Sequence, residues 1–243
     1  MNNIVFLSNK FYDFFLGIGE SVYQALIYDN RYKFIIEGLF NTVIIALFSV
    51  LIGIVIGTLV ALIRNNYDKN GKMKLGNFLA KGYVDIIRGT PVILQLMIIY
   101  YVIFKSVDIS VILVGILAFG INSGAYVSEI IRAGIQSISD GQTEAGYALG
   151  LNYKQVMQYI ILPQAIRNIL PALGNEFITL LKETSVGAYI GIIELTKASD
   201  IIASRTYDYF FPLILIAIIY LIMTLGLSKL VNLLERRLNH VRS

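Results

Sequence analysis

The sequence predicts an all-α polytopic membrane protein with five transmembrane helices, an external N-terminus and a cytoplasmic C-terminus. Of the 243 residues, 56% are hydrophobic and 15% are charged, whereas a soluble domain has about 45–50% apolar and about 25% charged residues. The apolar residues also gather in long uncharged runs, as in helices that cross a bilayer. The chain has no cysteine and only one histidine, His240, so no Cys- or His-built metal site is expected.

Residues 1–33 precede the first long apolar run and are predicted to form an N-terminal interfacial segment. Lys10 and Asp13 interrupt the hydrophobic stretch, so a cleavable signal peptide is not expected. Aromatic residues are frequent in this segment, and amphipathic rings settle at the level of the lipid headgroups. They are Phe6, Phe11, Tyr12, Phe14, Phe15, Tyr23, Tyr28 and Tyr32.

The first two predicted spans differ in regularity. Gly38 to Ile63 carries no charge and exceeds the about 20 helical residues that cross the hydrocarbon core; its Gly53–Gly57 pair has the spacing that lets helices pack closely. The second span, 75–104, is predicted to bend or break at Arg88, Gly89, Thr90 and Pro91. An ordinary proline kink explains the bend but not the Arg-Gly-Thr run before it.

The third span, 109–128, ends close to charged residues. Asn122, Tyr126 and Glu129 lie at i, i+4 and i+7, so they share one helical face. A carboxylate so near the hydrocarbon marks either a pathway or a partner. Arg132, three residues later, offers the alternative of a structural ion pair at the membrane boundary.

The fourth span, 164–181, is weakly hydrophobic because it contains Pro171, Asn175, Glu176 and Thr179. Such a helix is expected to be buried among others or to line a cavity. Residues 184–195 are too few to cross the membrane, and they form either an external gate or a plain interfacial helix. The fifth span is 209–228, and residues 235–243 form a basic tail.

A polar, glycine-punctuated segment, about 137–163, separates the third span from the fourth. Asp140 is predicted to cap a short helix, and Glu144 suits the positive end of its dipole. Ala145 and Gly146 leave a patch almost free of side chains, which a partner surface can approach closely. Gly150 supplies a left-handed stop. Asn152 caps a further helix, whose end is set by Leu162 and Pro163.

This segment resembles the cytoplasmic loop of the membrane subunits of ATP-binding-cassette importers. Their loop carries Glu-Ala-Ala, three residues, Gly, nine residues and Ile-x-Leu-Pro, and every spacing matches from Glu144 to Pro163. One position departs, because Gly146 replaces the second alanine. The stretches YVDIIRGTPVILQL and LPQAIRNILPALGNEFITLLKETS resemble the polar amino-acid (histidine, glutamine, arginine) branch of these permeases.

The resemblance implies a type I importer permease fold over residues 34–234, in the cell membrane of a prokaryote. It also implies a second permease copy or paralogue, cytoplasmic ATPase subunits that bind ATP and Mg²⁺, an extracytoplasmic solute-binding protein and an amino-acid substrate. The residues that it assigns to ATPase coupling are Asp140, Gly141, Glu144, Ala145, Gly146, Gly150, Leu162 and Pro163. The polar residues of the third and fourth spans are the candidates for a substrate path: Asn122, Glu129, Asn175, Glu176 and Thr179. Helix packing alone is the alternative explanation for them.

Charge placement and missing motifs narrow the function. Loops 64–88, 132–167 and 229–242 hold 13 Lys and Arg, and the opposite side holds 7, so the positive-inside rule places Glu144 in the cytoplasm. No phosphate-binding loop, catalytic constellation or metal-spaced cluster is present, so neither enzymatic activity nor a cofactor of its own is expected. The basic residues lie in short loops, so nucleic-acid binding is not expected. The alternatives are a secondary transporter or channel, or a permease for an osmoprotectant or methionine.

Overall fold

The structure, a computed structural model, describes Gly17 and residues 19–240 of the chain. Within this part all regular elements are helical, in agreement with the predicted class. The predicted interfacial residues 1–16 and 18, and residues 241–243 of the tail, lie outside the described residues. A short π-helix, η1 (Tyr23–Ile27), and a short 3-10 helix, η2 (Tyr28–Asn30), lead into the first long helix.

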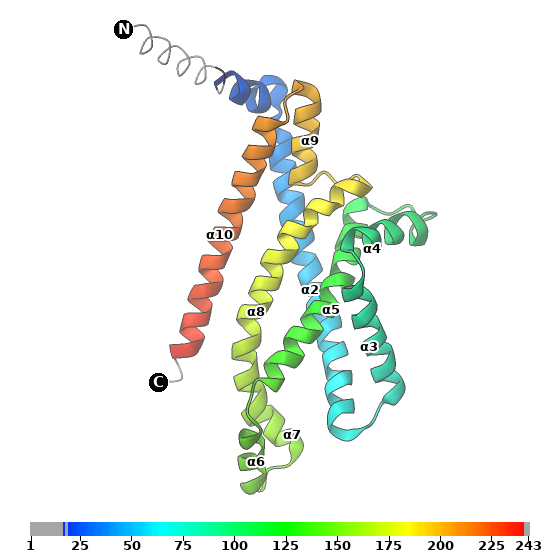
Figure 1. Ribbon diagram of the computed structural model, residues 1–243, viewed down its shortest axis with the longest axis vertical. Coiled ribbons are helices and arrows are strands. Elements are labelled where there is room, and N and C mark those ends of the chain that lie inside the picture. The colour runs from blue at the N-terminus through cyan, green and yellow to red at the C-terminus, as the bar shows by residue number, and fades with distance from the viewer. Residues whose placement is uncertain (1–16, 18, 241–243) are drawn as a thin grey trace.

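The most extensive contact between two helices of the described chain is that between α2 (Tyr32–Asn70) and α5 (Val111–Gln136) (Figure 1). Glycine makes this contact possible. A Cβ at Gly57 would lie 2.7 Å from Val127 Cβ and 2.8 Å from the Ser128 backbone nitrogen, and one at Gly53 would lie 2.8 Å from a side-chain oxygen of α5. The predicted close packing through Gly53 and Gly57 is therefore confirmed.

The predicted break in the second span is also confirmed. α3 (Lys74–Gly89) is followed by α4 (Val92–Ile98) and the π-helix η3 (Ile99–Ile103), and the helix axis bends by 109° between the two parts. Thr90 and Pro91 have extended backbone at the junction. The Gln95 side-chain amide donates to the Ile87 carbonyl at 2.8 Å and to the Thr90 carbonyl at 3.1 Å. One side chain thus satisfies carbonyl groups that the break leaves without helical partners.

The remaining helices are α6 (Asp140–Ala148), α7 (Tyr153–Val156), η4 (Met157–Ile161), α8 (Leu162–Glu183), η5 (Thr184–Ile190), α9 (Leu195–Thr206) and α10 (Phe210–His240). α8 corresponds to the weakly hydrophobic fourth span and packs against α2, α5 and α10. The start of α8 differs from the prediction. Pro163 does not end the preceding helix as predicted, because the chain continues from α7 through the single π-turn η4 directly into α8.

A buried carboxylate joins α9 to its neighbours. The Glu194 side chain is fully buried and accepts hydrogen bonds from the backbone N–H groups of Thr196 and Lys197, both at 2.7 Å, which caps α9. The Tyr220 hydroxyl of α10 donates to the same carboxylate at 3.2 Å. The backbone N–H of Leu195 donates to a threonine hydroxyl of α2. The segment 184–206 is therefore bonded to both α2 and α10.

The loops group at two ends of the molecule. Figure 1 shows α9 and the start of α2 at one end, and α6, α7 and the α2–α3 turn at the other, toward which the C-terminal end of α10 also runs. Among the described residues, α2, α5 and α10 are long and apolar enough to span a membrane, and α3 with α4–η3 passes the same test as one bent unit. The alternation of sides, the count of five spans and the orientation stay predictions.

Candidate functional site

The predicted coupling segment forms a compact knob that consists of α6, α7 and η4. Ser139, with extended backbone, takes the N-cap position, and Asp140 is the first helical residue rather than the predicted cap. Glu144 and Ala145 are exposed on the outer side of α6. At the end of the knob the side chains of Tyr147 and Leu149 are 48% and 78% exposed.

Gly146 faces the inside of this knob, which corrects the prediction of an open small-residue patch at this position. It is buried, and a Cβ on it would lie 2.8 Å from Val156 Cγ2 and 2.9 Å from Ile160 Cδ1. The close approach that needs a small residue is therefore within the chain. Ala145 keeps the predicted exposure.

The turn between α6 and α7 has the predicted form. Gly150 has φ +79°, a left-handed conformation that glycine adopts without steric cost, and its N–H donates to the Tyr147 carbonyl at 2.9 Å. Asn152 then caps α7 through a capping box with Gln155, in which each side chain accepts from the other residue's backbone N–H. These bonds determine the direction in which α7 leaves the turn.

Two side chains of α8 reach the start of the knob. The Gln164 amide donates to the Ile160 carbonyl at 2.8 Å and approaches the side-chain oxygen of Gln142 on α6 at 3.4 Å. The Asn168 amide donates at 2.8 Å to the Ser137 hydroxyl, just after α5, and this hydroxyl donates to the Gly134 carbonyl. Neither Gln164 nor Asn168 was predicted from the sequence.

On the other side of α6 the packing is open. A cavity of about 290 Å³ separates α6 from the end of α2. It is lined by Asn65, Asp68, Lys69, Ile135, Gln136, Ile138, Asp140, Thr143, Met157 and Ile161. Its polar lining includes residues of both helices, so α6 and α2 face each other without close packing here.

The predicted substrate-path residues divide into three groups. The Asn122 amide donates to the Gln95 side-chain oxygen at 2.8 Å, and the adjacent Ser123 hydroxyl donates to Glu176 at 2.8 Å. This polar chain connects α4, α5 and α8 beside the helix break. Asn175 and Thr179 are exposed on α8. Gln95 and Ser123 were missed, although Gln95 lies within the quoted GTPVILQL stretch.

Glu129 forms the third group, because it lies in an ion cluster between α2, α3 and α5. Arg64 of α2 donates to it directly and is its closest partner, while the predicted Arg132 approaches to 3.6 Å and Arg88 to 3.9 Å. Arg132 pairs with Asp68 at 2.6 Å. Glu129 therefore links helices that are far apart in sequence. The expected pairing with Arg132 is only part of the arrangement.

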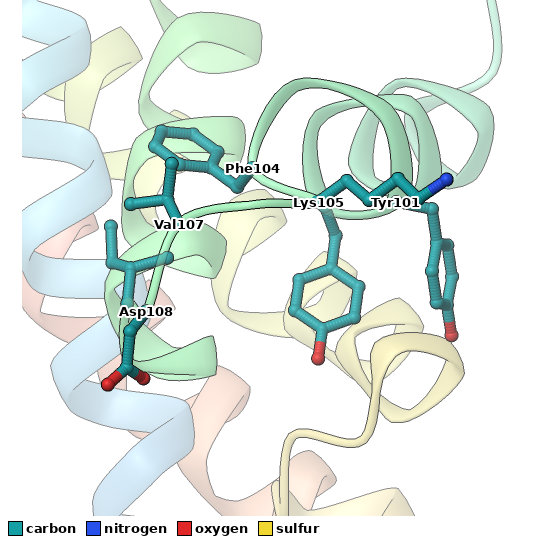
Figure 2. A pocket seen from close by; sticks show the side chains of 7 residues that line it. Tyr101, Phe104, Lys105, Val107 and Asp108 are labelled. Atoms are coloured by element: carbon teal, nitrogen blue, oxygen red, sulfur yellow. The ribbon is translucent and has the colours of Figure 1, made fainter.

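A further hollow, of about 410 Å³, lies beside η3 (Figure 2). It is lined by Tyr100, Tyr101, Phe104, Lys105, Val107, Asp108 and Ile109. Figure 2 shows the Lys105 amine and the Asp108 carboxylate pointing away from each other, so they do not form a paired site for a zwitterion. No group of His, Cys, Asp or Glu side chains that could hold a metal ion occurs in the described part of the chain.

Long apolar helices, an internal polar chain at a helix break and a short exposed helical knob are the features that the sequence analysis expected of a multi-pass membrane subunit. The chain belongs to the family described as binding-protein-dependent transport system inner membrane component, whose profile matches residues 53–240. It is thus a permease subunit and an inner-membrane protein, as the resemblance predicted. In this family ATP hydrolysis is the task of a separate subunit.

Named relatives fall in the amino-acid branch. The chain is 42% identical over 207 residues to the putative glutamine transport system permease protein of Rickettsia typhi, covering 84% of this chain and 93% of the relative. It is 39% identical to the arginine transport system permease protein ArtQ of Bacillus subtilis, covering 84% and 92%. A solved amino acid ABC transporter with histidines is 45% identical, with a TM-score of 0.79 and coverage of 85% and 94%. The methionine transporter MetNI, at 20% identity and a TM-score of 0.67, shares the fold. The expected type I permease fold is confirmed.

Proposed function

We propose that this permease subunit imports a polar amino acid and takes its energy from a separate cytoplasmic ATPase that binds α6. The knob carries the proposal, because it is a small helical projection with exposed Glu144, Ala145 and Leu149 at one end of the molecule. Relatives named for glutamine and arginine transport support the substrate class. A second permease copy or paralogue and an extracytoplasmic solute-binding protein complete the proposed assembly.

The mechanism follows from two alternative packings of the spanning helices. ATP-driven closure of the ATPase moves α6, and the inward- and outward-facing packings exchange because ATP binding favours one of them. The polar chain of Gln95, Asn122, Ser123 and Glu176 gives the amino acid hydrogen-bonding groups when it leaves water, where an unpaired polar group is costly. The Glu176 carboxylate would suit an ammonium or a cationic side chain.

The test is ATP-driven uptake by the complex reconstituted in vesicles, with the ATPase identified by co-purification. Glu144→Lys reverses the charge at an exposed site of α6, and we expect it to abolish uptake while membrane insertion is retained. Uptake at the wild-type rate by this variant would refute the coupling role. A secondary transporter or channel is distinguished by uptake that continues when ATP is depleted and ion gradients are held.

Substrate competition separates the proposed class from its rivals within the family. Polar and cationic amino acids, methionine and an osmoprotectant such as a betaine are offered to the same vesicles. We expect the polar amino acids to compete. Exclusive competition by methionine or the betaine would overturn the substrate proposal and leave the coupling proposal intact.

A further inference from the structure

We propose that Gln164 and Asn168 of α8 are positioning residues that hold α6 at a fixed angle to α8, so that displacement of α6 is transmitted to α8. The proposal rests on the proposed coupling role of α6. It assigns the transmission to a stripe of four side chains on one continuous helix: Val156, Ile160, Gln164 and Asn168.

α7, η4 and α8 form one helical rod. The three elements follow one another without a gap from Tyr153 to Glu183, and Val156, Ile161 and Leu162 at the junctions all have right-handed helical backbone. A rod of this kind transmits motion along its length. Through this rod the α7 and η4 part of the knob is continuous with α8, which packs against α2, α5 and α10.

The stripe contacts residues 137–146, which include most of α6, at successive positions. Val156 and Ile160 enclose buried Gly146 of α6. Gln164 reaches Gln142 in the first turn of α6, at 3.4 Å. Asn168 donates to Ser137 at 2.8 Å, at the end of α5. Both ends of the link from α5 to α6 are therefore bonded to α8.

The π-turn η4 keeps the stripe on one face of the rod. In an α-helix of about 3.6 residues per turn, positions four apart drift by about 40° per step, so twelve residues would carry the stripe about 120° around the rod. The π-turn η4, in which the Leu162 N–H donates to the Met157 carbonyl, accommodates one extra residue and winds the stripe back by about 100°. All four side chains can therefore face the α6 segment, which gives the π-turn a mechanical role.

α6 packs less closely against α2 than against the rod. The cavity of about 290 Å³ lies between α6 and the end of α2, so α6 does not pack closely against α2 at that place. The contacts with the rod are the close ones. Loss of the two amide contacts would let the link 137–139 absorb part of the movement.

The test measures how many solute molecules the complete reconstituted complex imports for each ATP hydrolysed. Asn168→Leu and Gln164→Leu remove the amides and keep side chains of similar volume. We expect an unchanged rate of ATP hydrolysis and a fall in import per ATP of about threefold to tenfold in the double variant, the range that one or two modest hydrogen bonds support. A purely structural role would instead lower import and hydrolysis together, through loss of assembled complex. Wild-type import per ATP in the double variant would overturn the proposal.

Thr224→Val is the matched control, since it removes one exposed side-chain hydrogen bond, to the Leu221 carbonyl of α10, far along the chain from the stripe. We expect wild-type import per ATP from it. A fall equal to that of Asn168→Leu would show that the loss of any such bond has this effect, and would overturn the assignment to the stripe.

Cross-linking gives a second readout, because the native chain has no cysteine. Ser137→Cys with Asn168→Cys removes the hydrogen bond, and we expect low import per ATP while both thiols are free. Joining them with a disulfide or a short bis-thiol reagent should restore import per ATP, because the two positions move together. Cross-linking that stops import, with recovery on release, would show that they must separate and would overturn the proposal. If the wild-type complex showed no ATP-driven import, the proposed function itself would fail; wild-type import with unaltered variants would overturn only this inference.

Discussion

Gly146→Ala tests whether the knob is packed as described. In α6 the substitution gains about 1 kcal/mol of helix propensity. The new methyl group would lie 2.8 Å from Val156 Cγ2 and 2.9 Å from Ile160 Cδ1, and overpacking of this kind costs about 1–3 kcal/mol. The net change in the free energy of opening of α6 is therefore between about zero and a loss of about 2 kcal/mol.

Hydrogen exchange of the α6 amides in the purified subunit measures this local opening directly. A loss of about 2 kcal/mol corresponds to protection factors lower by about thirtyfold. Val156→Ala makes room for the methyl group, so the two substitutions combined should cost less than their sum by at least about 0.5 kcal/mol. Protection that rises about fivefold in Gly146→Ala, with additive effects of the two substitutions, would refute the inward orientation of Gly146.

Three further predictions concern other positions. Gly57→Ala presses a methyl group against the backbone of α5 at 2.8 Å and should destabilise the subunit in thermal unfolding by about 1–3 kcal/mol; Gly226→Ala, with no atom within 4 Å of its Cβ, is the control and should not. Gly150→Ala places a side chain at φ +79° and should cost about 1–2 kcal/mol in the turn, seen as faster amide exchange in α6; exchange as in the wild type would contradict the strained turn. Glu176→Gln keeps the shape but removes the charge, so uptake of cationic amino acids should fall more than uptake of neutral ones; unchanged affinity and selectivity would remove Glu176 from the substrate path.

Much of the fold was predictable because its signals are local in sequence. Uncharged runs marked the long helices, the Arg88–Pro91 stretch marked the break, and glycine at 150 marked the left-handed turn. Each of these depends on the conformational preference of one or two residues or on hydropathy. Neighbouring sequence is sufficient for both.

The site was less predictable because its contacts join residues far apart in the chain. Arg64, the closest partner of Glu129, precedes it by 65 residues. The partner expected from the sequence was Arg132, which is three residues away from Glu129. Gly146 was expected to face a partner because spacing shows that a residue is small but not which side it faces. Pro163 was expected to end a helix. The helix instead continues through a π-turn, and a π-turn leaves no pattern in the sequence.

The most direct test of the central claim uses Leu149→Cys, at the exposed end of the knob, in this cysteine-free chain. A thiol cross-linker is applied to membranes that contain the assembled complex, and the product is identified by mass. We expect a cross-link between this subunit and an ATP-hydrolysing subunit, formed only by reagent that has access to the cytoplasmic side. Labelling of the introduced thiol by an impermeant reagent from outside the cell, or a product without an ATPase, would contradict the account.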